Sequence, residues 1–282
     1  MTFRSGIRGG AHPRRSARVR RASPRLSRVR AGAALGMLTA AGAMYGVAAS
    51  PAFGLGPVLV RGVRLTDPAE VTAGLAVSSG TNLFALATGP LAARLRELPT
   101  IASATVTVRL PDTLDVDVRE REPILVWDVA PRRFLVDRDG VLFAELQDGA
   151  DGRTPDGAPL PEMSDTRAGS TSLAVGARLD PLDLDAATRL GSIRPPDVGS
   201  AAARLKVSVT DENGFVVSAA PGGWSAVFGF YTPSLRRPDL IPGQVRLLRS
   251  LLADREPTVD RVILASDTSG TYLPRPSPTP RR

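Results

Sequence analysis

The chain has 282 residues, a formal net charge of +8 and no cysteine. The lack of cysteine excludes disulfides, thiolate metal sites and a cysteine nucleophile. The one histidine is His12, so the region after the first thirty residues has none for Ser-His-Asp catalysis or a zinc site. We therefore expect a protein that is not an enzyme, that holds no metal or cofactor and that takes no small-molecule substrate.

The positive charge lies almost entirely in the first thirty residues. They contain ten arginines and neither Asp nor Glu, which leaves 26 basic and 28 acidic residues in the rest of the chain. A basic segment beside an apolar one is typical of a topology signal that contacts lipid headgroups. We interpret residues 1–30 as a cytoplasmic tail. A nucleic-acid-binding arm is the alternative, although we expect no nucleic acid partner.

Residues 31–50 are long and apolar enough to cross a bilayer as one transmembrane helix. No charged residue occurs between Ala31 and Val60, and about twenty apolar residues span the hydrocarbon core. Arg28 and Arg30 flank this membrane anchor, and the positive-inside rule places them in the cytoplasm, with the bulk of the chain on the other side. The alternatives are a cleaved signal peptide and an Ala/Gly-rich linker that never inserts.

Residues 57–122 carry the pattern of a β-α-α-β-β domain. Asp67 precedes a proline and so gives a helix-start signal, and a stripe of leucines over 90–98 indicates a second helix. The runs 104–109 and 114–119 alternate apolar and polar residues on either side of a Leu-Pro-Asp-Thr turn. This alternation predicts an antiparallel hairpin with one buried face.

Residues 123–273 predict a mixed, mainly antiparallel β-domain with two helices. Short apolar runs flank Asp-Gly and Asn-Gly turns, which are typical of hairpins, and helices are expected over 180–190 and after Pro242. Residues 148–172 are rich in Gly, Pro, Asp and Ser, and we expect them to form a mobile loop. We expect a Pro-rich, disordered tail over 274–282. The fold class is therefore α+β.

Five short motifs follow one another along the first domain: Val60-x-Gly62, Gly80-x-Asn82-Leu83-Phe84, Leu95-x-x-Leu98-Pro99, Leu110-Pro111-x-Thr113-Leu114 and Glu120-Arg121-Glu122-Pro123. In order and spacing they resemble the POTRA domain of the FtsQ/DivIB family of bacterial cell-division proteins. The runs Leu135-Val136-Asp137-x-Asp139-Gly140 and Trp224-x-Ala226-x-Phe228-Gly229 are similar to parts of that family's β-domain.

The resemblance implies a bitopic scaffold of the divisome at the division septum, in the inner membrane with type II orientation and most of the chain periplasmic or extracytoplasmic. It implies that the scaffold links early and late division proteins and helps control septal peptidoglycan synthesis. A POTRA-type polypeptide-binding accessory of envelope protein secretion or translocation is the alternative.

The resemblance also implies partners and the surfaces that bind them. The partners are small coiled-coil division proteins of the FtsB/DivIC and FtsL type, bound by strand addition at the last strand. Carried over to this sequence, the partner-binding edge comprises Val262, Leu264, Ser266 and Thr268, with Tyr272 nearby. A second edge, containing Val58 and Val60, is expected to bind other divisome proteins. Family members often have an Asp-x-Arg pair in the closing strand, and Ile263-Leu264-Ala265 lacks it.

Overall fold

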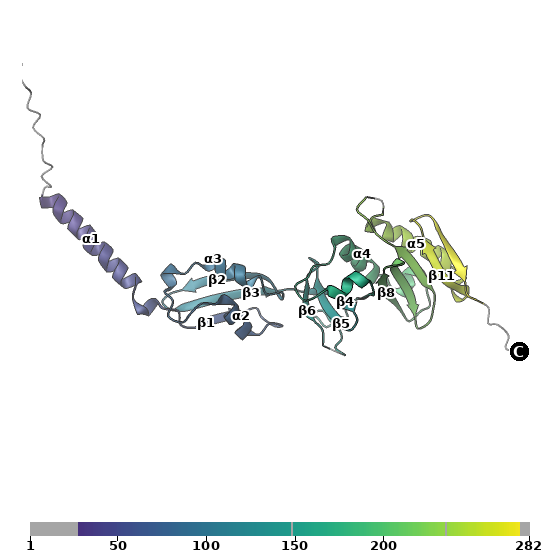
Figure 1. The fold of residues 1–282 in the computed structure, drawn as a ribbon, viewed down its shortest axis with the longest axis horizontal. Helices are drawn as coiled ribbons and strands as arrows, with labels where there is room; N and C mark the ends of the chain where they lie inside the picture. The colour runs from purple at the N-terminus through teal and green to yellow at the C-terminus, as the bar shows by residue number, and fades with distance from the viewer. Residues whose placement is uncertain (1–27, 148, 235, 277–282) are drawn as a thin grey trace, which may run out of the picture. The chain divides into compact units, whose positions relative to one another are not determined.

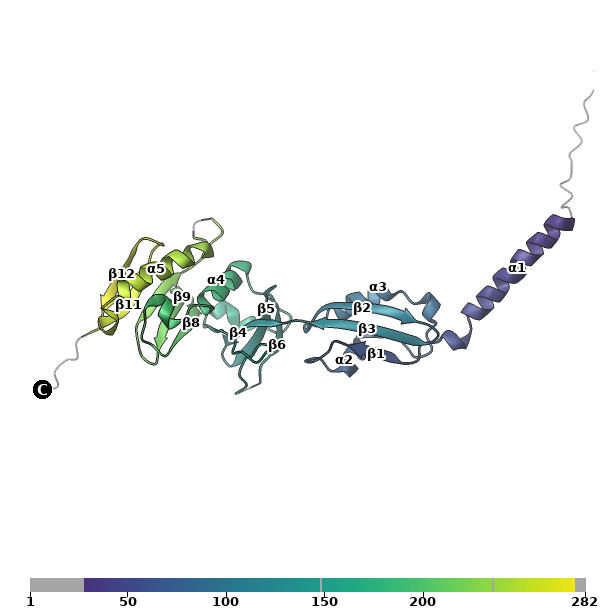
Figure 2. The same ribbon diagram turned by 180° about the vertical axis from the view of Figure 1, so that it is seen from behind.

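The computed structural model describes residues 28–147, 149–234 and 236–276, and the chain divides into two units, residues 1–50 and residues 51–282. Figures 1 and 2 show the same ribbon from opposite sides.

In the first unit, the described residues form one long helix, α1 (Arg28–Ala48). Its segment Val29–Ala48 is long and apolar enough to cross a membrane, and the rest of the protein buries none of it. The expected anchor, residues 31–50, overlaps this helix but is shifted, because α1 already includes Arg28 and Arg30. Residues 1–27 of the expected cytoplasmic tail lie outside the described residues.

The second unit begins with a three-stranded sheet in the order β1-β3-β2, on which two helices pack. Strand β1 pairs in parallel with β3, and β2 pairs with β3 as the expected antiparallel hairpin. The order β-α-α-β-β agrees with the sequence pattern. The elements are β1 (Val58–Arg61), α2 (Pro68–Leu75), α3 (Thr88–Leu95), β2 (Ile101–Arg109) and β3 (Thr113–Glu120), with short 3-10 helices η1 (Pro51–Phe53) and η2 (Leu83–Ala85).

Local sequence signals explain this small domain. The Asp67 side chain accepts a hydrogen bond from the Ala69 backbone N–H at 2.8 Å and so caps α2. Helix α2 buries Val71 and Leu75, which lie one turn apart. These side chains pack with the alternate apolar residues of β2 and β3 in one core. The apolar face of the helix and the apolar face of the hairpin therefore point into the same interior.

The rest of the second unit is organised by a nine-stranded sheet in the order β12-β11-β10-β9-β8-β7-β4-β5-β6. Five neighbouring pairs are antiparallel, and three pairs, β4 with β7, β7 with β8 and β10 with β11, are parallel. The strands are β4 (Pro123–Val129), β5 (Arg132–Asp137), β6 (Leu142–Glu145), β7 (Glu162–Asp165), β8 (Arg204–Thr210), β9 (Gly214–Ala220), β10 (Ser225–Gly229), β11 (Val259–Leu264) and β12 (Gly270–Pro274).

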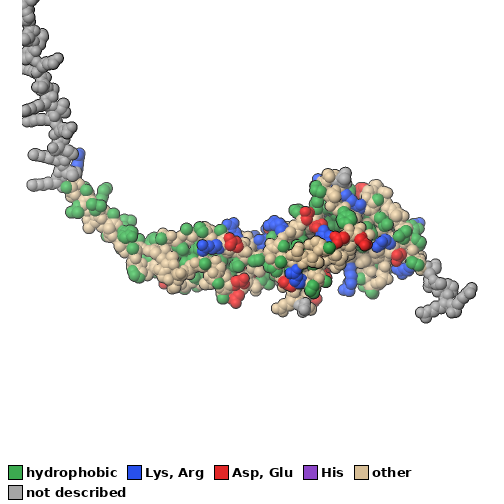
Figure 3. Space-filling view, in the orientation of Figure 1, with side chains coloured by type: hydrophobic (Ala, Val, Ile, Leu, Met, Phe, Trp, Pro, Cys, Tyr) green, Lys and Arg blue, Asp and Glu red, His purple; other side chains and the backbone are tan. Residues whose placement is uncertain are grey.

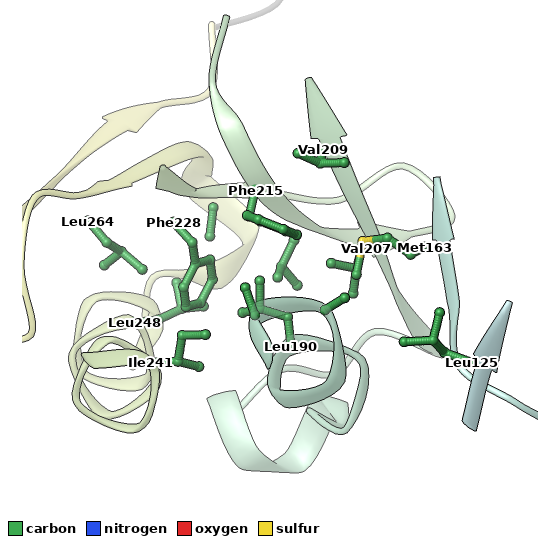
Figure 4. Close-up of a cluster of buried hydrophobic side chains, with 14 of the residues drawn as sticks. Leu125, Met163, Leu190, Val207, Val209, Phe215, Phe228, Ile241, Leu248 and Leu264 are labelled. Atoms are coloured by element: carbon green, nitrogen blue, oxygen red, sulfur yellow. The ribbon is translucent and has the colours of Figure 1, made fainter. Parts of the chain in front are cut away.

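Helices α4 (Pro181–Gly191) and α5 (Ile241–Leu252) pack on the same face of this sheet. Figure 4 shows Leu190, Ile241 and Leu248 pointing from the helices toward strand side chains that include Phe215, Phe228 and Leu264. A smaller cluster lies elsewhere on the sheet and comprises Val126, Leu135, Val141 and Phe143. The main core therefore extends from β6, through Leu142, to β11, through Leu264.

The structure differs from the sequence-based expectation in the segment 148–172. Its second half holds β7, which lies between β4 and β8 in the sheet and buries Met163 and Asp165. The buried Asp165 carboxylate accepts hydrogen bonds from the Trp127 indole at 3.1 Å and the Ser170 hydroxyl at 2.5 Å. Because its partners lie on other segments, a polar four-residue strand carries no local signal that separates it from a loop.

The expected tail, residues 274–282, also differs at its start, because β12 continues through Pro274. Residues 277–282 lie outside the described part of the chain.

Candidate functional site: the β12 edge of the nine-stranded sheet

The nine-stranded sheet ends at β12. Strand β11 lies between β10 and β12, pairing in parallel with β10 and antiparallel with β12. In the described part of the chain, β12 pairs with β11 alone, and all five residues of β12 are exposed. The sheet therefore ends in a solvent-exposed edge strand, which we call the β12 edge (Gly270–Pro274).

The expected edge residues lie in three different environments. The side chains of Val262 and Leu264 are 0% and 1% exposed and belong to the core under α5. This corrects the expectation that they form the edge, because β11 is an interior strand. Ser266 and Thr268 lie in the turn that follows β11, and Tyr272 lies on β12 itself.

The β11–β12 turn is closed by its own hydrogen bonds. The Ser266 hydroxyl accepts from the backbone N–H groups of Thr268 at 3.2 Å and Ser269 at 2.9 Å. The Ser266 N–H in turn donates to the Ser269 carbonyl at 3.0 Å. A serine hydroxyl that satisfies local backbone groups is a turn-forming device. These contacts assign Ser266 the role of holding β12 against β11.

Apolar side chains project from both faces of this edge. Tyr272 is 36% exposed and stands opposite Val262, and Leu273 is 48% exposed and stands opposite Arg261. The Arg255 guanidinium lies 5.8 Å from the centroid of the Tyr272 ring, which is a cation–π distance. Because successive strand residues point to opposite faces, Tyr272 lies on one face of the edge and Leu273 on the other.

The start of β11 is fixed by Glu256. Its carboxylate accepts hydrogen bonds from the Trp224 indole at 2.9 Å, the Ala201 backbone N–H at 2.9 Å and the Ser200 hydroxyl. Burial alone raises the pKa of Glu256, but these hydrogen bonds outweigh it and lower the pKa below its ordinary value. The ionised carboxylate therefore ties the start of β11 to the segment before β8 and to the residue before β10.

The opposite ends of β10 and β11 are joined by Arg236. Its guanidinium donates hydrogen bonds to the carbonyl of Phe228, the next-to-last residue of β10, and to the carbonyl of Leu264, the last residue of β11. The buried Gln244 side chain donates to the Phe228 carbonyl at 3.4 Å and accepts from the Tyr231 hydroxyl at 2.9 Å. Burial raises the pKa of Tyr231, so this residue stays a neutral donor.

Gln244 and Arg236 were not among the residues expected to form this site. The spacing contained a signal for Gln244, because it falls on the same helical stripe as Ile241 and Leu248, which the structure buries. Arg236 lies in an irregular segment, and its partners are backbone carbonyls on distant strands. No pattern in the sequence identifies such a contact.

The other expected edge, in the three-stranded sheet, is β1. This strand lies at one end of the order β1-β3-β2, so it is an edge strand. The side chains of Val58 and Val60 are half-buried and pack against the core, and Leu59 between them is 40% exposed. The backbone of β1, and not the two valine side chains, is the part of this edge that faces outward.

Comparison with known proteins agrees with this architecture. Residues 53–121 match the family description "POTRA domain, FtsQ-type", which covers the three-stranded sheet and its two helices. The chain is 31% identical over 158 residues to "Cell division protein FtsQ" of Mycobacteroides abscessus, covering 54% of this chain and 47% of that protein. Proteins of the same name from Streptomyces collinus and Mycolicibacterium smegmatis are 31% and 34% identical over 181 and 146 residues.

The extent of these matches differs. The Streptomyces collinus match covers 64% of this chain and 67% of that relative, and the Mycolicibacterium smegmatis match covers 51% and 41%. The chain thus spans about half the length of two of these relatives and two thirds of the third. All three relatives are named as cell division proteins and none as an enzyme. One apolar N-terminal helix before such domains fits a bitopic membrane protein. The chain belongs to the FtsQ family of cell division proteins.

Proposed function

We propose that the chain is a bitopic membrane scaffold of the divisome that captures a partner protein by strand addition at the β12 edge. The observation that carries the proposal is the position of β12, a strand without a buried residue that pairs on one side only in the described chain. An edge strand presents backbone N–H and C=O groups on its outer side, and an extended segment of a partner can add itself there as a further strand.

The proposed partners are small coiled-coil division proteins of the FtsB/DivIC and FtsL type. In strand addition, main-chain hydrogen bonds supply affinity and side chains on the two faces supply specificity. Tyr272 and Leu273 are the exposed anchors for such a segment, and Ser266 and Thr268 shape the turn beside it. Val262 and Leu264 contribute by holding β11 in place from within the core.

The proposed topology follows from the distribution of charge. Ten arginines and no acidic residue precede residue 31, and this asymmetry supports a cytoplasmic N-terminus, with Arg28 and Arg30 at the membrane flank. Residues 51–282 would then lie in the periplasm or its extracytoplasmic equivalent, concentrated at the septum. There the protein would link early and late division proteins and help control septal peptidoglycan synthesis, with β1 as a second edge for other divisome proteins.

Cysteine cross-linking tests strand addition directly, because the natural chain has no cysteine. Thr271→Cys and Leu273→Cys place thiols on the same face of β12, two residues apart. Each variant of the full-length chain is paired in membranes with a cysteine scan of an FtsB/DivIC-type partner. We expect oxidation to give a cross-link with one partner position, and we expect that position to shift by two residues between the two variants.

Glu145→Cys is the matched control, since Glu145 is exposed and lies on β6, the other end strand of the same sheet. We expect no cross-link from residue 145. Cross-links without a two-residue shift, or cross-links of equal yield from residue 145, would overturn strand addition at β12.

A further inference from the structure

Three segments meet at the end of the three-stranded sheet where the chain leaves α1. The Leu55 backbone N–H donates to the Thr81 carbonyl at 2.8 Å, and the Gly80 N–H donates to the Leu55 carbonyl at 2.9 Å. The Gly56 N–H donates to the Asp112 carbonyl at 2.7 Å and so adds the β2–β3 turn. Residues 53–56, 80–84 and 110–112 therefore form one end of the domain.

This end exposes apolar side chains. The rings of Phe53 and Phe84 meet edge to face, with centroids 4.8 Å apart. Phe84 is 54% exposed and Leu110 is 48% exposed, although both belong to a domain whose other large apolar side chains are mostly buried. We call Phe53, Phe84 and Leu110 the apolar tip. Contiguous exposed apolar side chains, unlike scattered single ones, are typical of protein or membrane interaction sites.

The apolar tip is also poor in charge. Neither the segment 31–60 nor the segment 71–93 contains Asp, Glu, Lys or Arg. Asp112 is half-buried and its carboxylate accepts a hydrogen bond from the Thr113 hydroxyl at 3.0 Å, and Arg109 pairs with the buried Asp115. On the face drawn in Figure 3, this end of the domain is green and tan, and blue and red side chains begin farther along it.

Chain length restricts where the apolar tip can be. Phe53 follows Ala48, the last residue of α1, by five residues, so the two lie at most about 18 Å apart for any orientation of the domain. The intervening residues are partly helical, with the Ser50 N–H bonded to Val47 and the Gly54 N–H bonded to Pro51, which shortens the reach further. A 20-residue span matches the roughly 30 Å hydrocarbon thickness, so Phe53 stays near the headgroup layer.

We propose that the apolar tip is a lipid-contacting surface that seats the POTRA domain on the bilayer crossed by α1. The inference rests on the proposed function, because it requires α1 to be inserted. Phe and Leu side chains of interfacial segments bury into the boundary between headgroups and acyl chains. The carboxylate at this end, that of Asp112, is half-buried and hydrogen-bonded, so repulsion from anionic lipid is small. Contact with lipid would limit how far the domain swings about the short connection and would aim the rest of the chain away from the membrane.

A tryptophan reporter tests the proposal in the full-length chain, reconstituted in phospholipid nanodiscs. The two native tryptophans, Trp127 and Trp224, are buried in the C-terminal core and give a constant background. Phe84→Trp places a reporter in the apolar tip. We expect lipids brominated high on the acyl chain to quench the emission of this reporter. We also expect its emission maximum to lie at a shorter wavelength than that of a tryptophan exposed to buffer.

Leu65→Trp is the matched control. Leu65 is 57% exposed in the same domain, but its backbone N–H donates to the Glu120 carboxylate, beside Arg64. We expect brominated lipid to leave its emission unchanged and aqueous acrylamide to quench it more than it quenches Phe84→Trp. Equal lipid quenching of the two reporters, or none for Phe84→Trp, would overturn the inference.

Tyr45→Trp, within α1, separates this inference from the proposed membrane anchor. Quenching of Tyr45→Trp without quenching of Phe84→Trp overturns lipid contact by the apolar tip and leaves the anchor intact. Absence of quenching for Tyr45→Trp overturns both. In a second measurement, Phe84→Cys and Leu65→Cys each carry a polarity-sensitive dye, and we expect a blue shift on bilayer reconstitution for residue 84 alone.

Discussion

The two ends of the nine-stranded sheet are built differently. At β6, the Leu142 backbone N–H donates to the Ala177 carbonyl at 2.9 Å, and the Leu142 carbonyl accepts from the Gly176 N–H at 2.8 Å. Val141 next to β6 also forms an antiparallel bridge with Arg178. The segment 176–178 therefore covers the start of the β6 edge, whereas no pairing of this kind occurs on the outer side of β12 among the described residues.

Side-chain burial follows the same division. Strand β6 buries Leu142 and Phe143 and ends at the charged Glu145, but β12 has no buried residue. Proteins block unused sheet edges with loops and charges, since an open edge pairs with other chains. The comparison indicates that β6 is closed as part of folding, whereas β12 stays open, as the proposed strand addition requires. Stability should thus depend on the strands beneath β12, and binding on β12 itself.

The largest expected effect separates a core leucine from an edge leucine. Leu264→Ala empties a fully buried site, and we expect the free energy of unfolding to fall by about 2–5 kcal/mol. Leu273→Ala changes a half-exposed side chain, and we expect a loss of at most about 0.5 kcal/mol in stability. It should nevertheless weaken the partner's affinity about tenfold, since it removes an interface anchor of roughly 1.4 kcal/mol.

Urea unfolding of the nanodisc-bound chain, followed by fluorescence of Trp127 and Trp224, gives the stabilities, and titration with the partner gives the affinities. If Leu273→Ala destabilised the fold as much as Leu264→Ala, the interpretation of β12 as an edge strand whose side chains contribute little to stability would be wrong.

A smaller effect is expected at the start of β11. Glu256→Gln removes the charge that accepts three hydrogen bonds, and we expect a loss of about 1–3 kcal/mol in the free energy of unfolding at pH 7. The pKa of Glu256 is depressed in the folded state. Its contribution is therefore present above the unfolded pKa and is lost as the pH falls through the folded pKa. The difference between wild type and variant should narrow below pH 4.5, the ordinary pKa of the group.

Asp260→Asn, which neutralises an exposed carboxylate on β11, serves as the control. Unfolding curves of wild type and both variants, recorded between pH 7 and pH 3, give the difference in the free energy of unfolding as a function of pH. A wild-type advantage over Glu256→Gln that stayed constant with pH would mean that the carboxylate does not act through its charge.

Periodic and capped elements of this fold could be predicted from the sequence. The start of α2 was predicted from the Asp67-Pro68 pair and a helix was expected over 180–190, and the structure shows the side chains of Asp67 and Asp180 capping these two helices. The β2–β3 hairpin was predicted because alternation places its apolar residues on one face. Such features depend on neighbouring residues, so the local sequence contains the information.

The β12 edge could be predicted only in part. The resemblance placed the proposed partner surface at the last strand, which the sequence pattern put at the apolar run containing Val262 and Leu264. Gly270–Pro274 has no buried face and so lacks the alternation that would have identified it as a further strand. Whether β11 is interior or exterior depends on a second strand added after it. Edge position is thus a property of the assembled sheet, and local pattern does not determine it.

The smallest expected effect concerns the cover of the β6 edge. Gly176 has φ +91°, a conformation that residues with a Cβ rarely adopt, although a Cβ there would meet only the Pro99 side chain at 3.8 Å. Gly176→Ala should therefore strain the covering segment and cost about 1 kcal/mol through its backbone. Gly169→Ala is the control, since its site is open and its φ is ordinary.

Because the Gly176 strain falls on the segment that bonds Leu142, amide hydrogen exchange at Leu142 should become faster in Gly176→Ala. Exchange of the β11 amides should stay unchanged. If Gly176→Ala and Gly169→Ala gave the same exchange rate at Leu142 as the wild type, the segment 176–178 would not be what protects β6. The contrast between a covered and an open edge would then have to rest on the charge of Glu145 alone.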